Sequence, residues 1–211
     1  MTIKLYCFGE SGNSYKAALT LQLCGLDWQP EYVDFFNGAA RDPAFRKINV
    51  VGEIPVLVDG DETMTQSGVM QQYAAQKSGK LGGSTPAEAR DAMRWQFFDN
   101  HKLSSNAGMT RFLMNFLPEE KRPAEVIAFT QGRLKAAYKI LDAALEDRDW
   151  LVGRSVTIAD TACCGYLYYP EPFGFDRADW PNIDRWLGNI AALDGWKSPY
   201  DLMPGSPADR A

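Results

Sequence analysis

Hydrophobic and polar residues follow two kinds of pattern over the first 77 residues of the chain. β-forming residues alternate from Ile3 to Phe8, which predicts a strand, and a polar loop at 10–13 leads into a helical pattern that Gly25 ends. The rest of this region predicts strands at 28–35, 55–58 and 62–64, a short helix near 43–48 and a helix at 67–77. The order β-α-β-α-β-β-α is typical of a small α/β domain.

The pattern changes after a stretch at 78–86 that is rich in glycine and serine. No strand pattern follows it, and helical periodicity marks the segments 87–116, 123–145, 157–168 and 183–193. The sequence therefore predicts an α/β domain at 1–79, a linker at 80–86 and an all-α domain at 87–211.

Composition narrows the class of protein. Of the 211 residues, 45% are hydrophobic and 23% are charged, which is ordinary usage for a globular protein. No apolar run reaches the ~18 residues of a membrane span, so no membrane partner is expected. The formal net charge of −5 and the lack of a basic run disfavour nucleic acid as a partner. With His101 as the only histidine, no metal site is expected.

The four cysteines are Cys7, Cys24, Cys163 and Cys164, and their spacing matches neither a redox motif nor a zinc site. They are too sparse for a disulfide framework, and the N-terminus lacks the pattern of a signal peptide. A reduced, cytoplasmic location is the expectation.

The loop that begins at Ser11 is the first segment that suggests chemistry. It joins the first predicted strand to the first helix, so the side chains of Ser11 and Asn13 would lie near the positive end of a helix. Such a place suits an anionic sulfur or a carboxylate. The structural alternative is an ordinary loop in which Ser14 caps the helix.

Two further segments could bind an extended peptide. Pro55 opens a central strand, and a cis bond after Ile54 would turn the backbone of Ile54 out of the sheet. The alternative is a trans proline at the start of a strand. Gln66 and Ser67 stand directly before a helix, where the Ser67 hydroxyl and the free amides could bind a carboxylate or simply form a helix cap.

These segments, in this order and on this frame, resemble the cytosolic glutathione S-transferase family of the serine type, and the resemblance covers nearly the whole chain. The motifs that carry it are Lys-Leu-Tyr at 4–6, the Ser-Gly-Asn loop, the segment 48–57, Gln66-Ser67, the capping motif from Ser155 to Asp160, and the closing-helix residues Trp180 to Asn182 and Trp186. The resemblance implies a thioredoxin-like α/β N-terminal domain and an all-α C-terminal domain. It also implies that Thr157 and Asp160 cap a buried helix reciprocally.

The resemblance further implies roles for individual residues. Ser11 would donate a hydrogen bond to the glutathione sulfur, and Asn13 fits a second template in which an amide approaches it. Lys16 would act structurally or electrostatically. The residues that would bind the glutathione backbone and its carboxylates are Arg41, Glu53, Ile54, Pro55, Gln66 and Ser67.

The sequence also departs from the family. Glu53 replaces a polar or basic group near the glycyl carboxylate, and Ala40 stands where related classes carry a histidine. A like charge at that place weakens the binding of glutathione unless Arg41 or Lys47 compensates. Tyr6 and Cys7, which could rival Ser11 as sulfur partners, lie inside the strand pattern and are interpreted as core.

The electrophile would bind between the first loop and the long helix after the linker. The candidates for this pocket are Phe8, Phe36, Trp95, Phe98, His101, Ser105, Thr110, Arg111 and Phe112. Aromatic residues at helical spacing are equally typical of a hydrophobic core. Because the family is dimeric, a homodimer is expected, with Phe35-Phe36 as a candidate anchor.

Conjugation of glutathione to a small hydrophobic electrophile is the function that this resemblance implies. Glutathione would be the co-substrate, and no metal would be required. Two alternatives stay open: a glutathione-dependent peroxidase or disulfide reductase that uses the same loop, and a non-catalytic protein that keeps the fold for interactions.

Overall fold

The structure is a computed structural model that describes residues 2–207. The described chain divides into two compact units, one formed by residues 2–82 together with 194–207 and the other by residues 83–193.

The first unit is built on a four-stranded mixed sheet with the strand order β2-β1-β3-β4. Its strands are β1 (Ile3–Cys7), β2 (Trp28–Tyr32), β3 (Val56–Asp59) and β4 (Glu62–Thr65). β1 pairs in parallel with β2 and antiparallel with β3, while β3 and β4 form the expected hairpin. This arrangement, with the helices described next, is the thioredoxin-like fold that the sequence predicted.

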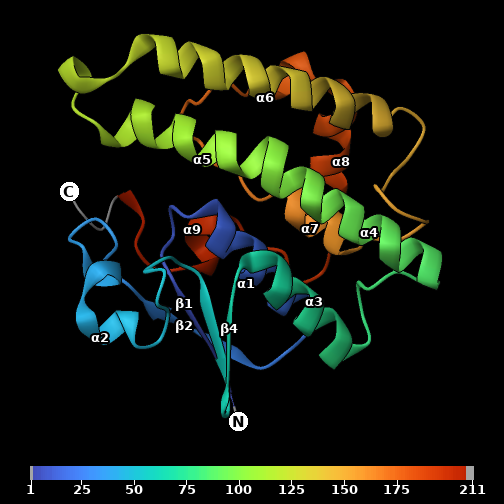
Figure 1. The fold of residues 1–211 in the computed structure, drawn as a ribbon. Coiled ribbons are helices and arrows are strands. Elements are labelled where there is room, and N and C mark those ends of the chain that lie inside the picture. The colour runs from blue at the N-terminus through green and yellow to red at the C-terminus, as the bar shows by residue number, and fades with distance from the viewer. Residues whose placement is uncertain (1, 208–211) are drawn as a thin grey trace. The chain divides into compact units, whose positions relative to one another are not determined.

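The side chains of successive residues in β1 point to opposite faces of this sheet. Leu5 pairs with Leu57 and both are fully buried, whereas the neighbouring pair Tyr6 and Val56 belongs to a cluster with Phe45 of the short helix α2 (Pro43–Arg46). α1 (Gly12–Cys24) and α3 (Ser67–Ser78) pack side by side (Figure 1). A buried hydrogen bond of 3.1 Å from Gln71 to the Thr20 hydroxyl joins these two helices.

The C-terminal segment 194–207 belongs to this first unit, not to the helical domain in which the sequence placed it. It contains α9 (Pro199–Leu202), which packs against α1, and Leu202 and Met203 are buried there. No hydrophobic periodicity reveals so short a helix, so the contacts of this segment depend on the folded chain.

The regular secondary structure of the second unit, over residues 83–193, is all helical. Its first predicted helix, 87–116, is a helical path with two π-helical stretches. The parts are α4 (Pro86–Phe98), η2 (Asp99–Ser104), α5 (Ser105–Arg111) and η3 (Phe112–Phe116), followed by the short turn η4 (Glu119–Lys121). A π-helical stretch adds residues to a turn without breaking the helix, so the 3.6-residue pattern does not expose it.

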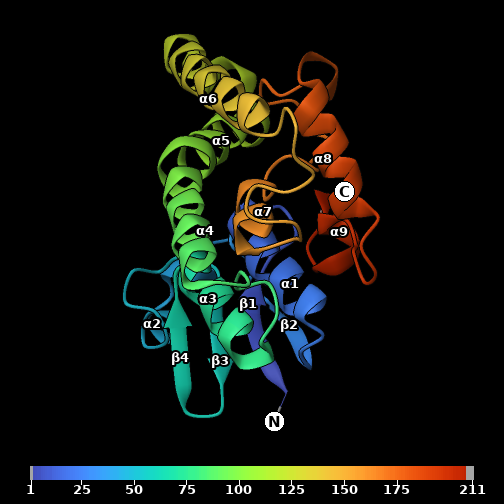
Figure 2. The same ribbon diagram turned by 90° about the vertical axis from the view of Figure 1, so that its right-hand side faces the viewer.

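The remaining helices are α6 (Ala124–Ala144), α7 (Ile158–Cys163) and α8 (Pro181–Ala191), with the turn η5 (Arg177–Asp179) before α8. α6 runs back beside α5, and α7 packs against α4 (Figure 2). Thr157 and Asp160 form the predicted capping box at the start of α7, and the Asp160 carboxylate also accepts hydrogen bonds from Leu151 N–H and the Trp186 indole, both at 2.9 Å.

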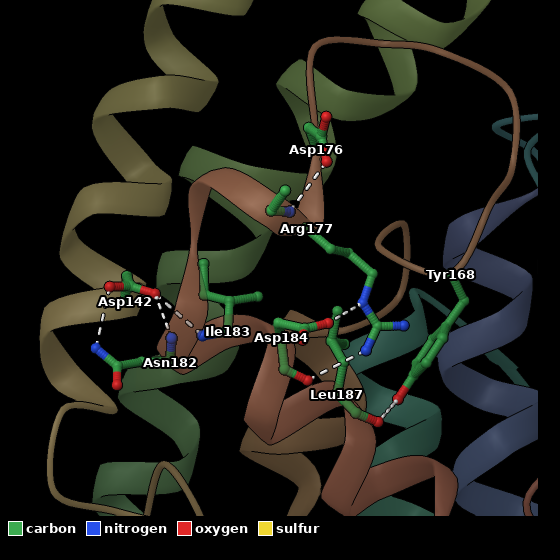
Figure 3. Close-up of polar contacts among 9 residues, drawn as sticks. Asp142, Tyr168, Asp176, Arg177, Asn182, Ile183, Asp184 and Leu187 are labelled. Carbon is green, nitrogen blue, oxygen red and sulfur yellow. Dashed lines mark hydrogen bonds and ion pairs between the residues drawn. The ribbon is translucent and has the colours of Figure 1, made fainter.

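A second carboxylate fixes α8. Figure 3 shows Asp142 of α6 facing Asn182 and Ile183 at the first turn of α8. Its Oδ1 accepts both backbone N–H groups at 3.0 Å, and its Oδ2 accepts the Asn182 side-chain amide at 3.1 Å. Tyr168 donates its hydroxyl to the Leu187 carbonyl at 2.7 Å and so holds the middle of the same helix. Over residues 2–207, no helix combines the length and the apolar character needed to cross a bilayer.

Candidate active site

Ser11 occupies the N-cap of α1, where the loop after β1 turns into the helix. Its backbone is extended, with φ −90° and ψ 107°, and its Oγ accepts the backbone N–H of Ser14 at 3.1 Å. Ser11, not Ser14, is therefore the capping residue. A hydroxyl has one proton and two lone pairs, so a cap that uses Oγ as the acceptor leaves the Ser11 proton available to donate.

A buried lysine lies five positions after Ser11, at the start of the second turn of α1. Lys16 is only 1% exposed, and its Nζ donates a hydrogen bond to Oδ1 of Asn13 at 3.1 Å. This bond uses the acceptor side of the Asn13 amide and leaves its Nδ2 as the donor side. Sequence spacing placed Lys16 inside the helix but did not reveal this contact, because a lysine near the start of a helix is usually solvated.

Cys7 is a core residue, as the strand pattern predicted, whereas Tyr6 is partly buried and packs against the core. Tyr6 contacts the ring of Phe45 edge-on at a centroid distance of 6.1 Å. Cys7 is fully buried, and burial raises the pKa of its thiol to about 12. Cys7 is therefore disfavoured as a thiolate, which leaves Ser11 and Asn13 as the candidate sulfur partners of this loop. The loop also holds the buried carboxyl side chain of Glu10.

The segment 49–55 positions the Ile54 backbone beside the sheet. The Ile54–Pro55 bond is cis. In the described sheet, β3 pairs with β1 and β4 from Val56 onward, so Ile54 lies just outside the ladder. The buried side chain of Asn49 holds this segment, because its Nδ2 donates to the Glu53 carbonyl at 2.8 Å and its Oδ1 accepts the Val51 N–H at 3.1 Å. Asn49 was not among the residues that the sequence singled out for a role.

Gly52 brings a second loop against this segment. It has φ +70°, and a Cβ there would lie 2.9 Å from the Ala40 carbonyl oxygen, so a larger residue does not fit. Ala40 is buried in the cluster with Phe45 and directs no side chain toward a ligand. Its neighbour Arg41, at the end of η1 (Ala39–Arg41), lies over Gly38 and is exposed.

Arg46 is the basic residue next to Gly52, since its Nε would lie 3.5 Å from a Cβ at that position. Glu53 follows Gly52 directly and is exposed. The sequence suggested Arg41 or Lys47 as compensating charges for Glu53. The structure places Arg46 beside Gly52, the residue before Glu53. The sequence alone did not distinguish Arg46 from the basic residues on either side of it.

Gln66 and Ser67 begin α3, with Ser67 as the first helical residue. Gln66 has φ +70° and ψ 117°, a backbone conformation that costs a residue with a side chain about 1–3 kcal/mol. Strained backbone of this kind persists where the surrounding structure fixes it, and it gathers at ligand sites. No local sequence signal marks this strain.

The two predicted pocket residues of the first unit form an aromatic cluster. Phe8 stacks on Phe35 at a centroid distance of 4.9 Å, and Phe36 meets both rings edge-on at 5.7 Å. Phe8 is buried, whereas Phe35 is 37% exposed.

The other predicted pocket residues belong to the helical unit. Trp95 is buried and meets Phe98 edge-on at 5.2 Å. His101 and Ser105 are exposed, and Ser105 donates its hydroxyl to the His101 carbonyl at 3.1 Å. The exposed Phe112 lies in the π-helical stretch that follows α5.

Two polar candidates of the helical unit make internal contacts. Thr110 is buried and donates its hydroxyl to Thr130 at 2.8 Å. The Arg111 guanidinium is buried 2.8 Å from Glu171 and 3.8 Å from the centroid of the Tyr169 ring. Arg111 therefore has an ion-pair partner and an aromatic partner inside the helical unit. The sequence had placed it among the candidates for the electrophile pocket.

Comparison with known proteins defines the class. The family model "Glutathione S-transferase, N-terminal domain" matches residues 1–76, and "Glutathione S-transferase, C-terminal domain" matches residues 105–194. The chain therefore belongs to the glutathione S-transferase family and is a glutathione transferase, a class of enzyme that uses glutathione as a substrate.

Individual relatives agree with this assignment. Glutathione S-transferase 3 of Zea mays is 31% identical over 97% of this chain and 96% of its own. The disulfide-bond oxidoreductase YfcG of Escherichia coli is 28% identical over 89% of each chain. A crystal structure described as a possible glutathione S-transferase from Rhodopseudomonas palustris superposes with a TM-score of 0.88, at 27% identity, over 100% of this chain and 96% of that one.

Proposed function

We propose that this enzyme conjugates the thiolate of glutathione to small hydrophobic electrophiles and that Ser11 stabilises the thiolate. The observation that carries the proposal is the hydrogen bond from Ser14 N–H to the Ser11 Oγ at 3.1 Å. It fixes the hydroxyl at the N-terminus of α1 as an acceptor toward the helix and a donor away from it.

The chemistry requires a lower thiol pKa. A free thiol has a pKa of about 8.5 and is mostly protonated at neutral pH, whereas the thiolate is the nucleophile. A hydrogen bond to a charged group contributes about 1.5–3 kcal/mol, and 1.36 kcal/mol corresponds to about one pH unit of pKa. The N-terminus of α1 and the buried Lys16 add positive potential beside the sulfur.

The step itself balances without a further reactant. The thiol proton passes to water, and the thiolate forms a sulfur–carbon bond with the electrophile. In a substitution the leaving group departs with the bonding electron pair, and in an addition the carbanion takes a proton from water.

Glutathione would lie along the edge formed by Ile54 and the start of α3. The backbone of Ile54, which lies just outside the ladder, would pair with the cysteinyl residue. Ser67 and the N-terminal amides of α3 would bind the γ-glutamyl carboxylate, helped by Gln66. Arg41 and Arg46 would offset Glu53 near the glycyl carboxylate.

We further propose a homodimer in the cytoplasm and an electrophile pocket walled by aromatic residues. All four cysteines are free thiols, as expected in a reducing compartment. The partly exposed Phe35, stacked on Phe8, is the proposed dimer anchor.

Disulfide reduction is the second candidate, because the similarity to the oxidoreductase YfcG supports it. A disulfide substrate would accept the same thiolate, and the mixed disulfide would then be resolved by a second glutathione. The two functions differ in the electrophilic atom, carbon or sulfur.

The test combines binding with turnover. Calorimetry with glutathione should show binding to the native enzyme that Ser67→Ala weakens about tenfold and Ser11→Ala changes less than about twofold. Conjugation of a dinitro-substituted aryl chloride should fall about 10- to 100-fold in Ser11→Ala.

An absence of binding at about millimolar glutathione would refute the proposal. So would full activity in Ser11→Ala. Faster reduction of a small aliphatic disulfide than conjugation of the aryl chloride would instead favour the second candidate.

A further inference from the structure

The C-terminal segment 194–207, which we name the strap, is hydrogen-bonded to the chain on both sides of Ser11. Before Ser11, the Gly9 N–H donates to the Pro204 carbonyl at 2.5 Å. After Ser11, the Tyr15 hydroxyl donates to the Lys197 carbonyl at 2.9 Å. The two bonds therefore fix residues two positions before and four positions after the capping serine.

The strap also fits closely at its far end. A Cβ on Gly9 would lie 3.0 Å from the Gly205 carbonyl oxygen and 3.2 Å from the Pro204 oxygen. Gly205 has φ +84°, and a Cβ on it would lie 2.5 Å from the ring of Tyr32. An alanine at Gly9 would have to displace the strap or the backbone beside Ser11. An alanine at Gly205 would be strained by the positive φ and would have to displace the ring of Tyr32.

The loop between β1 and α1 transmits this restraint to Ser11. The Ser11 N–H donates to the Phe8 carbonyl at 3.1 Å, so Gly9 lies within the turn that this bond closes. Tyr15 is fully buried in the first turn of α1, and its own N–H donates to the Ser11 carbonyl at 2.9 Å. A displacement of Gly9 or Tyr15 therefore moves the backbone that aims the Ser11 hydroxyl.

We propose that the strap is a positioning element for Ser11, attached through the carbonyls of Pro204 and Lys197 among other contacts. This inference rests on the proposed function, in which Ser11 stabilises the glutathione thiolate. The strap contributes no group to the reaction. It fixes the geometry of the donor, and a hydrogen bond to an anion weakens steeply as its distance and angle depart from the optimum.

The strap should therefore affect thiolate formation more than glutathione binding. Ile54, Gln66 and Ser67 lie on other elements, so the Michaelis constant for glutathione should change little when the strap is altered. The pKa of the bound thiol should rise. The rate should fall most at a pH below that pKa, where the fraction of thiolate is limiting.

Two shortened chains test this directly. One ends at Met203 and lacks the Pro204 carbonyl and Gly205, and its control ends at Pro207 and keeps the whole strap. We expect the thiol pKa of bound glutathione to rise by about one pH unit in the first chain alone, with a fall in kcat of about tenfold near pH 6.5. At a pH above the raised pKa, the difference in kcat should shrink below about twofold.

Point variants keep the proposal testable if the shortened chain does not fold. Gly9→Ala introduces the predicted clash, and Tyr15→Phe removes the bond to Lys197. Gly132→Ala is the matched control, because outside its chain neighbours and the local backbone of its own helix no atom lies within 4 Å of a Cβ at that position. Gly9→Ala and Tyr15→Phe should raise the thiol pKa, and Gly132→Ala should not.

A double-mutant cycle separates positioning from general destabilisation. With Ser11→Ala already present, loss of the strap should cause no further rise in the thiol pKa, because both changes remove the same interaction. A thiol pKa unchanged by every strap variant would overturn the strap's role, as would effects that add to Ser11→Ala. If Ser11→Ala itself leaves the pKa unchanged, the proposed function fails, and the two failures are thereby distinguished.

Discussion

Lys16 donates a hydrogen bond from its buried ammonium group to the side-chain carbonyl of Asn13 at 3.1 Å. Asn13 lies in the first turn of α1 after the capping Ser11, and Lys16 begins the second turn. The contact holds an ammonium group that is nearly shielded from water close to Ser11, the residue proposed to stabilise the thiolate. An interaction between charges is stronger at such a place than at the surface, because water screens it less.

Replacing Lys16 by methionine should therefore raise the pKa of enzyme-bound glutathione. We expect a rise of about one pH unit, with partial rescue in Lys16→Arg, which keeps the charge. The ultraviolet absorbance of the thiolate, followed against pH, measures this pKa. Lys139→Met, at an exposed position of α6, serves as the control. An unchanged pKa in Lys16→Met would show that the cation has only a structural role.

Cys7 should take no part in catalysis. Burial raises the pKa of its thiol to about 12, so the thiol stays protonated at every pH well below that value. We expect that iodoacetamide leaves Cys7 unmodified in the native enzyme near pH 8, as peptide mass analysis would show. Cys7→Ala should keep kcat/KM within about twofold of the native value. Rapid alkylation of Cys7 in the native enzyme, together with loss of activity in Cys7→Ala, would contradict the assignment of Ser11.

Asn49 should affect the binding of glutathione without affecting its thiol. Its side chain spans the segment before the cis bond through Val51 N–H and the Glu53 carbonyl. Loss of these bonds in Asn49→Ala frees the backbone of Ile54, and we expect KM for glutathione to rise about fivefold. Steady-state kinetics and the thiol titration measure the two effects separately. Asn189→Ala in α8 is the control, and a raised thiol pKa in Asn49→Ala would count against this division of roles.

Local sequence signals predicted the elements that depend on neighbouring residues. The capping box of Thr157 and Asp160 is confirmed because the two side chains lie three positions apart and need no distant partner. The hairpin at Asp59 to Glu62 and the end of α1 at Gly25 are confirmed for the same reason. The motif order was also enough to predict the family, because several weak motifs in sequence exclude most other folds.

Contacts between distant backbone groups could not be predicted in this way. The Pro204 and Lys197 carbonyls that hold Gly9 and Tyr15 belong to no side chain, so the sequence carries no mark of them. The strain at Gln66 is similarly set by the surrounding fold. The end of the helical domain could not be predicted for the same reason. The strap belongs to the first unit, but no change in composition marks the point where it begins.

Asp142 should contribute to the stability of the helical unit. Its carboxylate accepts two backbone N–H groups at the first turn of α8, where no bond within the helix is available to them (Figure 3). Loss of a capping side chain costs about 0.5–2 kcal/mol. Asp142→Ala should therefore lower the melting temperature by about 1–8 °C in a chain of this size.

Calorimetry would measure this change, and Asp147→Ala, at an exposed position, provides the control. Because Asp142 lies in the helical unit and the strap in the other, the thiol pKa should stay at its native value in Asp142→Ala. Equal melting temperatures for the two aspartate variants would show that the cap contributes nothing.

The most direct test of the account is the pKa of glutathione bound to the native enzyme and to Ser11→Ala, measured by thiolate absorbance. The account predicts a native pKa well below the value of about 8.5 for a free thiol, and a rise of at least about one pH unit when the Ser11 hydroxyl is removed. The same pKa in both proteins would contradict the central claim that Ser11 stabilises the thiolate.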